Sequence, residues 1–382
     1  MEYALSELFT LQMGKTPSRD NSSYWKKSEN NWISIADLTN SGKYISNTKE
    51  TLSDSAVAES GIKKIPANTV IMSFKLSLGK VAITEKEMYS NEAIMAFIDK
   101  GVKKISPEYL YYLLRAKDWS KGTNKAVMGA TLNKATLSTI KIQLHEYDNQ
   151  LEIVNMLNRV SSSIDFRKQQ LTKLDELVKA RFVEMFGDPI QNEKCWEIKS
   201  LFDLGYCKNG MNFHKGDHGV EIHCLGVGDF KDRSTIYDVK NLPYVALNES
   251  PDSDYLLQDG DIVFVRSNGN KELVGRCLAI YPENVPVTYS GFCIRYRLTS
   301  EKASVPYILR VLKADSVRKK MAGRGANIQN LNQQTLSQLA IPLPPLSLQN
   351  QFADFVAEVD KSKLFVELFA QSTCILAENR SK

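Results

Sequence analysis

The chain repeats itself with a period of about 199 residues, and this repeat constrains the fold more than any other feature. The positions that match at this offset include polar and apolar residues alike. They are Leu132 with Leu331, Thr136 with Thr335, Ile142 with Ile341, Gln150 with Gln349, and Pro107 with Pro306. Two copies of one sequence pattern predict two copies of one structure.

The match continues upstream with small insertions. Segment 33–38 resembles 225–230, and Pro66–Lys75 resembles Leu257–Arg266. Each copy then reaches a glycine, Gly79 or Gly275, directly before an apolar run. Because several blocks match in the same order, we interpret the chain as a tandem duplication.

Each copy has a globular part followed by a long helix. The globular part alternates short β-branched runs with turn residues, which predicts a compact α/β fold. The helical part contains no internal Gly or Pro. We therefore expect an α+β protein with a first globule at 1–147, a long helix at 148–186, a second globule at 187–345 and a second long helix at 346–382.

Heptad spacing in both helices predicts that they pair with each other as an antiparallel coiled coil. The expected seam consists of Leu157, Val160, Ile164, Arg167, Leu171, Leu174, Val178 and Arg181 in the first helix, and Phe352, Phe355, Val359, Val366 and Phe369 in the second. The alternative is that each helix packs as a core helix of its own globule.

Two arginines, Arg167 and Arg181, interrupt the seam. Their long side chains either extend out of the seam to water, or meet acidic groups on a partner protein. The sequence leaves both interpretations open.

Composition excludes several classes of protein. No run of about 18 apolar residues is present, so no transmembrane helix is predicted, and the first residues do not form a signal peptide. The six cysteines form no C-x-x-C pair, which favours reduced thiols and a cytoplasmic location. The net charge of +5 and pI near 8.6 permit DNA binding but are lower than for a typical free-standing DNA-binding domain, for which a pI above about 9 is usual.

The motifs and their duplicated order resemble the specificity subunit of type I restriction–modification systems, the HsdS family, over essentially the whole chain. The blocks that carry the resemblance are Gly14-Lys-Thr-Pro-Ser18, Trp32-Ile-Ser-Ile-Ala-Asp37, Gly260-Asp-Ile-Val-Phe-Val-Arg-Ser-Asn268 with Leu273-Val-Gly275, and the stretch from Gly325 through Ile341-Pro-Leu-Pro-Pro-Leu346 to Gln349.

This resemblance implies a non-catalytic subunit in which each globule is a target-recognition domain for one half of a bipartite double-stranded DNA sequence. The helices would set the spacing and dock two methyltransferase (M) subunits. Motor–nuclease (R) subunits would complete the full complex. It also implies no cofactor in this chain, with S-adenosylmethionine, ATP and Mg²⁺ bound by the partner subunits.

Base reading requires Arg, Lys, Asn or Gln side chains on rigid loops, and phosphate contacts require basic or hydroxyl groups. Two places in each copy fit this need: the loop after the central strand, and the segment after the helix that begins near Pro107 or Pro306. The candidates are Lys75, Ser77, Lys80, Lys121 and Lys125 in the first copy, and Arg266, Ser267, Asn268, Asn270, Lys271, Arg276, Arg318, Lys319, Lys320 and Arg324 in the second.

Catalytic motifs are absent: the sequence has no Walker A phosphate loop and no G-x-G-x-x-G turn. The alternative of a metal-dependent nuclease depends on Asp188, Glu197 and Lys199. A zinc site is the alternative for the group Cys207, His214, His218, His223 and Cys224, but its glycine-rich setting disfavours one. A third possibility is an adaptor whose globules bind proteins.

Overall fold

A computed structural model describes residues 1–26, 28–75, 77–119, 124–126, 129–214, 216–230, 233–322 and 330–380. Only the backbone is described for 124–126, 129–131, 271, 322 and 367–380. The chain separates into two compact units, of which the first comprises Met1–Ile164 and the end of the chain, and the second Asp165–Ile375. Each unit is described by itself.

The first copy contains ten strands, paired in three sheets, that recur in the second copy. Its strands are β1 (Glu2–Ala4), β2 (Phe9–Met13), β3 (Asn30–Ile33), β4 (Tyr44–Ile45), β5 (Glu50–Leu52), β6 (Val70–Ser73), β7 (Val81–Thr84), β8 (Tyr89–Ser90), β9 (Ile94–Asp99) and β12 (Lys141–Gln143), with the additional hairpin β10 (Asn124–Ala126) and β11 (Gly129–Thr131). Its helices are α1 (Leu5–Leu8), η1 (Ser22–Trp25), α2 (Ile35–Asn40), α3 (Asp54–Ser60), α4 (Pro107–Ala116), α5 (Lys134–Thr139) and the long α6 (Tyr147–Phe186).

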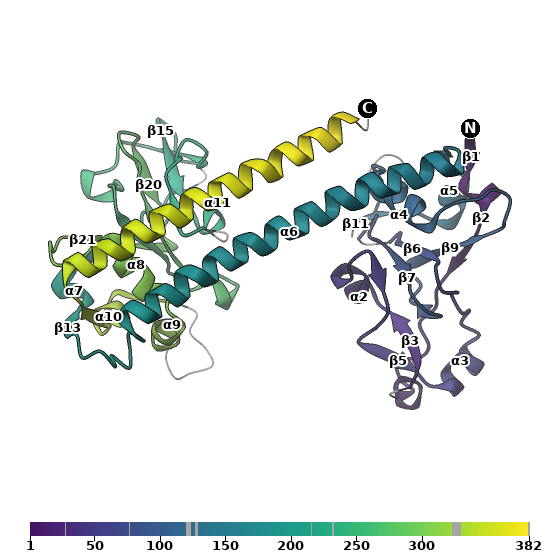
Figure 1. Cartoon of the computed structure of the whole chain (residues 1–382), viewed down its shortest axis with the longest axis horizontal. Helices are drawn as coiled ribbons and strands as arrows, with labels where there is room; N and C mark the ends of the chain where they lie inside the picture. Colours follow the sequence, from purple (N-terminus) through teal and green to yellow (C-terminus); the bar gives the residue numbers. More distant parts are fainter. Residues whose placement is uncertain are drawn as a thin grey trace. The chain divides into compact units, whose positions relative to one another are not determined.

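The second copy follows the same order (Figure 1). Its strands are β13 (Glu197–Ser200), β14 (Gly205–Asn209), β15 (Val220–Leu225), β16 (Thr235–Ile236), β17 (Tyr244–Leu247), β18 (Asp261–Val265), β19 (Cys277–Ile280), β20 (Val287–Tyr289), β21 (Cys293–Leu298) and β22 (Ala340–Leu343). Its helices are α7 (Leu201–Leu204), η2 (Val227–Asp229), η3 (Ser253–Tyr255), η4 (Lys271–Leu273), α8 (Val305–Lys313), α9 (Asp315–Ala322), α10 (Gln333–Ser337) and the long α11 (Leu346–Arg380).

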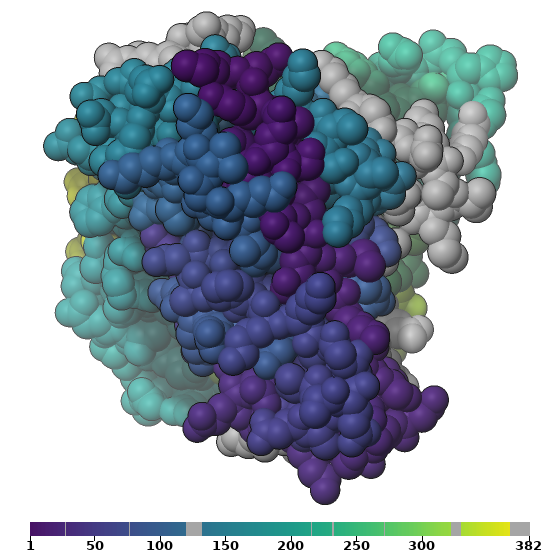
Figure 2. All heavy atoms as spheres, turned by 90° about the vertical axis from the view of Figure 1, so that its right-hand side faces the viewer, coloured from purple at the N-terminus to yellow at the C-terminus, as the bar shows by residue number. Residues whose placement is uncertain are grey.

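Both copies have the same sheet topology, as the repeat predicts. The five-stranded sheets run β2-β9-β6-β7-β4 and β14-β21-β18-β19-β16, and the three-stranded sheets run β5-β3-β8 and β17-β15-β20. A short pair closes each copy, because β1 pairs with β12 and β13 with β22. The start of the chain, dark purple in Figure 2, therefore lies against the end of the first globule.

Alternating side chains place a core on each face of the central sheet. In the first copy, Val70 and Met72 of β6 pack with Leu110 of α4, whereas the intervening Ile71 packs with Ile33 of β3 on the opposite face. In the second copy, Ile262 and Val263 divide in the same way between the two faces. Each sheet is thus covered by helices on one face and by the three-stranded sheet on the other.

Hydrogen bonds define which loop residues correspond between the copies. The Ser73 amide donates to the Lys80 carbonyl, and the Val265 amide donates to the Arg276 carbonyl, so Lys80 and Arg276 are equivalent. The Leu132 amide donates to the Phe74 carbonyl, and the Leu331 amide donates to the Arg266 carbonyl. Arg266 therefore corresponds to Phe74, one residue before the Lys75 that the sequence alignment predicts.

The helix after the central sheet begins at equivalent serines. Ser106 is the N-cap of α4 and Ser304 the N-cap of α8, so Pro107 occupies the first helical position and Pro306 the second. The offset between the copies is therefore 198 residues here, one less than the constant offset of 199. Arg115 and Lys313 are consequently equivalent, as are Tyr112 and Arg310.

A buried glutamine joins each long helix to its globule. The Gln349 side chain is fully buried and accepts a hydrogen bond from the Ser304 amide (2.9 Å), while donating to the carbonyls of Lys302 (3.0 Å) and Pro344 (2.8 Å). Gln150 accepts from the Ser106 amide in the same way. Because buried main-chain groups require partners, this one side chain links the start of the long helix to the start of the preceding helix.

Within the second unit, α6 and α11 run antiparallel (Figure 1). The rings of Phe182 and Phe352 lie 5.5 Å apart, and further along the pair the Lys363 ammonium lies 2.7 Å from the Asp175 carboxylate. Later residues of α11 thus contact earlier residues of α6. None of the helices in the described part of the chain is long and apolar enough to span a membrane.

We predict that Gln349→Leu lowers the free energy of unfolding by about 2 kcal/mol, because it leaves one buried amide and two carbonyls without partners. Chemical denaturation of the full chain, followed by far-UV circular dichroism, measures this loss. Gln351→Leu, at an exposed position of the same helix, is the control. Equal stability of the two variants would contradict the anchoring role.

Candidate nucleic-acid interface

The start of the loop after β18 is held by main-chain hydrogen bonds to two neighbouring segments. The Arg266 amide donates to the Phe292 carbonyl (2.8 Å), and the Arg266 carbonyl accepts from the Leu331 amide (2.8 Å). Ser267 forms an isolated bridge with Asn330. The half-exposed Arg266 side chain therefore projects from a backbone that is fixed to two neighbouring segments.

The asparagines of this loop shape its turn. The Asn268 side-chain oxygen accepts from the Asn270 amide (2.8 Å), and the Asn270 oxygen accepts from the Glu272 amide (3.0 Å). Such local bonds are the usual reason for Asn in tight turns. Their side-chain NH₂ groups remain available to donate to a base edge.

In the first copy, the corresponding loop is shorter, and its lysines contact their own globule. The Lys80 ammonium donates to the Thr39 hydroxyl (2.6 Å), and the Lys75 ammonium lies 5.3 Å from the centre of the Phe74 ring. Ser77 contributes its carbonyl to the Ser73 hydroxyl. Lys75, Ser77 and Lys80 are all half-exposed.

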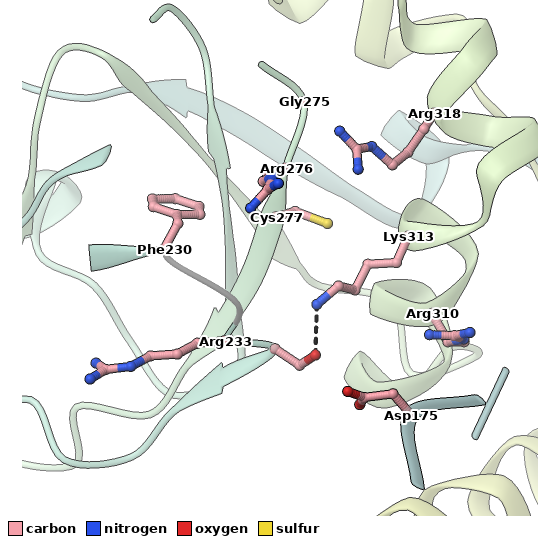
Figure 3. A pocket seen from close by; sticks show the side chains of 10 residues that line it. Asp175, Phe230, Arg233, Gly275, Arg276, Cys277, Arg310, Lys313 and Arg318 are labelled. Atoms are coloured by element: carbon pink, nitrogen blue, oxygen red, sulfur yellow. Dashed lines mark hydrogen bonds between the residues drawn. The ribbon is translucent and has the colours of Figure 1, made fainter. Parts of the chain in front are cut away.

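A groove of about 370 Å³ lies in the second unit between β19, α8 and α9 (Figure 3). Five of its lining residues are basic and one is acidic: Arg233, Arg276, Arg310, Lys313, Arg318 and Asp175. In Figure 3 the guanidinium of Arg318 points toward Arg276, whereas Arg233 points away from the other four. We call this surface the basic groove.

Two cations of the basic groove are substantially buried. Burial lowers the pKa of Lys313 and also that of Arg310, and the Asp175 carboxylate only partly offsets this for both groups. The Lys313 ammonium donates to the Ser234 hydroxyl (2.7 Å), and Asp175 also pairs with Lys363. The Asp175 carboxylate is therefore shared between the groove and Lys363 outside it.

The structure brings together the two candidate regions of the second copy. Arg276, from the loop after the central strand, and Arg318, on α9, line the same groove, and Arg318 donates to the Glu272 carbonyl (3.2 Å). Lys319 and Lys320 are exposed on α9 outside it. Lys121 and Arg324 lie outside the described residues, and only the backbone of Lys125 and Lys271 is described.

The sequence interpretation missed Arg233. It also did not distinguish the basic residues that line the groove from those beside them that lie outside it. Arg233 follows η2 in a turn and belongs to no motif. Its counterpart in the first copy is Gly42, because Thr235 pairs with Ala279 as Tyr44 pairs with Ile83. No signal in the repeat could have identified it.

The buried stripe of α6 differs from the predicted heptad seam at its end. Val178, Phe182, Met185 and Phe186 are buried, whereas Arg181 is half-exposed and pairs with Glu184 (2.9 Å). The buried positions shift around the helix here because this end of α6 packs on Tyr307 of α8 as well as on α11.

The other residues of the expected seam have varied exposure. On α11, Phe352, Val359 and Val366 are buried. Those that are half-buried are Leu157, Val160, Ile164, Arg167, Leu171, Leu174 and Phe355. The Arg167 guanidinium donates to the Gln170 side chain (2.9 Å). Only the backbone of Phe369 is described.

The residues of the zinc and nuclease alternatives are used in other ways. Burial raises the pKa of the Cys207 and Cys224 thiols to about 12, and His214 is exposed on a loop. The Asp188 carboxylate accepts from the Ile190 and Gln191 amides, and Glu197 pairs with Lys199 at 2.6 Å. In the part of the chain that is described, no three His, Cys, Asp or Glu side chains are placed to hold a metal ion.

A duplicated α/β globule, linked to long antiparallel helices and carrying basic loops, defines the class of DNA specificity domains. The family model for the type I restriction modification DNA specificity domain matches residues 1–176 and 194–367. The chain belongs to this family, whose specificity subunits are non-catalytic.

Known relatives include two specificity subunits. The type I restriction enzyme MjaIX specificity subunit of Methanocaldococcus jannaschii is 26% identical over 260 residues, covering 59% of this chain and 60% of that protein. The StySPI specificity subunit of Salmonella potsdam is 24% identical over 280 residues, covering 68% of this chain and 59% of that protein. The chain thus spans about three-fifths of the length of each.

Solved structures share the fold. The S subunit of a type I restriction–modification system from M. genitalium superimposes with a TM-score of 0.52 at 12% identity, covering 99% of this chain and 94% of that one. A chain from a study of complex assembly and conformational transition of the type I R-M system gives a TM-score of 0.56 at 15% identity, with the same coverage.

Proposed function

We propose that this chain is the DNA sequence-specificity subunit of a type I restriction–modification enzyme. Each globule reads one half of a bipartite target in double-stranded DNA, and the two long helices set the spacing between the halves. The observation that carries the proposal is the duplication itself: the same sheets, in the same order, present a loop with a basic side chain at equivalent positions, Lys80 and Arg276. Two equivalent readers suit a target with two parts.

The chain acts in complex with partners that hold the cofactors. Two methyltransferase subunits bind S-adenosylmethionine and dock on the long helices, and motor–nuclease subunits add ATP and Mg²⁺ chemistry. DNA recognition belongs to the domains of residues 1–147 and 187–345. Docking of the methyltransferase subunits belongs to the helices of residues 148–186 and 346–382. Since the enzyme acts on chromosomal DNA, its location is the cytoplasm.

Exposed apolar side chains on the long helices support docking of a partner. Phe166 of α6 is 58% exposed, and Leu177 and Val183 on the same helix are about half exposed. On α11, Leu364 and Phe365 are similarly exposed. Exposed apolar groups on these helices supply contacts that a docked partner protein would bury. They lie outside the heptad positions, so the seam and the docking surface use different faces.

We predict that Phe166→Glu reduces copurification of the methyltransferase subunits with a tagged chain at least about tenfold, because it places a charge in an apolar contact. Phe166→Leu, which retains an apolar side chain, should keep the complex intact. Since Phe166 is exposed, circular dichroism should show both variants folded. Normal association of the glutamate variant would exclude this position from the interface.

We predict that Arg266→Ala changes the preferred base at one position of the target. A bidentate contact to a guanine discriminates by about 1–3 kcal/mol, so binding to the original sequence should weaken while substituted duplexes bind equally well. Fluorescence anisotropy with a panel of single-base variants measures this.

By contrast, we predict that Lys320→Ala weakens binding to every duplex alike and lowers the slope of log affinity against log salt concentration by about 1.

The function itself is tested by the adenine methylation pattern of the host genome with and without this gene. We expect one bipartite motif to lose methylation when the gene is deleted and to regain it on complementation. The motif also identifies the two half-sites and their spacing. An unchanged methylation pattern, with the methyltransferase genes expressed, would contradict the proposal.

A further inference from the structure

Among the described residues, the basic groove lies in the second copy, and the equivalent positions of the first copy hold different side chains although both copies share the same fold. The positions equivalent to Arg233, Arg276, Arg310 and Lys313 are Gly42, Lys80, Tyr112 and Arg115. Two cations are thus replaced by uncharged residues in the first copy. Lys43, equivalent to Ser234, is paired there with Glu108. The two copies thus share the sheet topology, and among the described residues they differ in charge at these positions.

The side chains of the groove suit an anion with several oxygen atoms. Four of the five cations are arginines, whose planar forks donate two parallel hydrogen bonds to phosphate. Among the described residues, Arg310 has no ion-pair partner at bonding distance, and Asp175 is shared with Lys363. Burying a cation such as Arg310 without a matching acid costs free energy, and a bound anion removes that cost.

The groove has the size of a ligand site. Its volume of about 370 Å³ lies at the lower end of the range of roughly 300–1,000 Å³ in which proteins bind small ligands. Figure 3 shows Lys313 extending into it from α8, with Arg318 facing Arg276 across it. A single phosphate with its attached sugar would meet cations from a strand and from two helices.

We propose that the basic groove of the second copy binds one phosphate group, jointly held by Arg276, Arg310, Lys313 and Arg318. This inference rests on the proposed function for the source of that group, which is the backbone of the bound DNA. Among the described residues of the first copy, two of the equivalent positions hold the uncharged Gly42 and Tyr112. The half of the target bound by the second copy therefore contributes more of the salt-dependent affinity than the half bound by the first.

The test uses the full chain and the variant Arg276→Gln/Arg318→Gln, whose side chains are only half-buried. Lys240→Gln, exposed in the same copy outside the groove, is the control. The first measurement is thermal unfolding in inorganic phosphate at matched ionic strength. We expect phosphate to raise the Tm of the wild type and of the control, and the double variant to lose that rise.

The second measurement is the salt dependence of binding to a target duplex by the complex with methyltransferase subunits. One jointly held phosphate predicts that the log–log slope falls by about 0.9 in the double variant, and that affinity falls at least about tenfold. A decrease in the slope about twice as large would mean that the two arginines contact two separate phosphates. That result would overturn joint binding of one phosphate.

The two measurements also separate the sources of the phosphate. If the Tm effect depends on the groove but the DNA slope does not change, a soluble phosphate compound and not the DNA backbone occupies it. If neither measurement distinguishes the double variant from Lys240→Gln, the groove binds no phosphate and the proposal fails. Failure of the wild-type complex to bind DNA would instead contradict the proposed function, and the Tm measurement would still test the groove.

Discussion

The buried glutamine at the start of each long helix is the contact on which the rest of the arrangement depends. Gln150 and Gln349 each satisfy three main-chain groups. These groups belong to the N-cap serine of α4 or α8, to the residue two positions before that serine, and to the turn that leads into the long helix. A leucine would fill the space but leave those groups without partners. The direction in which each helix leaves its globule is therefore set by hydrogen bonding and not by apolar packing alone.

The two copies show how one fold can carry two different surfaces. The sheets, the capping serines Ser106 and Ser304 and the anchoring glutamines are shared because they satisfy the backbone and the core. The loops and the outer faces of the helices are free to differ. If each globule reads its own half-site, as proposed, this division lets specificity change without cost to the fold. The basic groove, built on positions that are Gly42 and Tyr112 in the first copy, is an example.

Much of the fold could be predicted from the sequence. The repeat predicts equal topology, heptad spacing predicts long helices, and the absence of glycine and proline predicts their uninterrupted length. The predictions were less accurate at single-residue resolution. The block match misaligned Arg266 with Lys75, and the constant offset misaligned Pro306 with Pro107, because short insertions in loops leave no trace in apolar periodicity. The hydrogen bonds around Phe74 and Ser304 identify the correct equivalents.

The sequence by itself determined that the chain forms two equivalent globules with long helices, because duplicated patterns of apolar and polar residues permit only equivalent folds. It also limited the DNA-contacting candidates to two regions of each copy. Only the tertiary structure decided which side chains meet. Phe182 rather than Arg181 is buried because this end of α6 packs against both α8 and α11. Arg276, Arg310 and Arg318 form one groove because a strand and two helices converge there. Electrostatic interactions act through space, so their strength depends on distances that the order of residues does not contain.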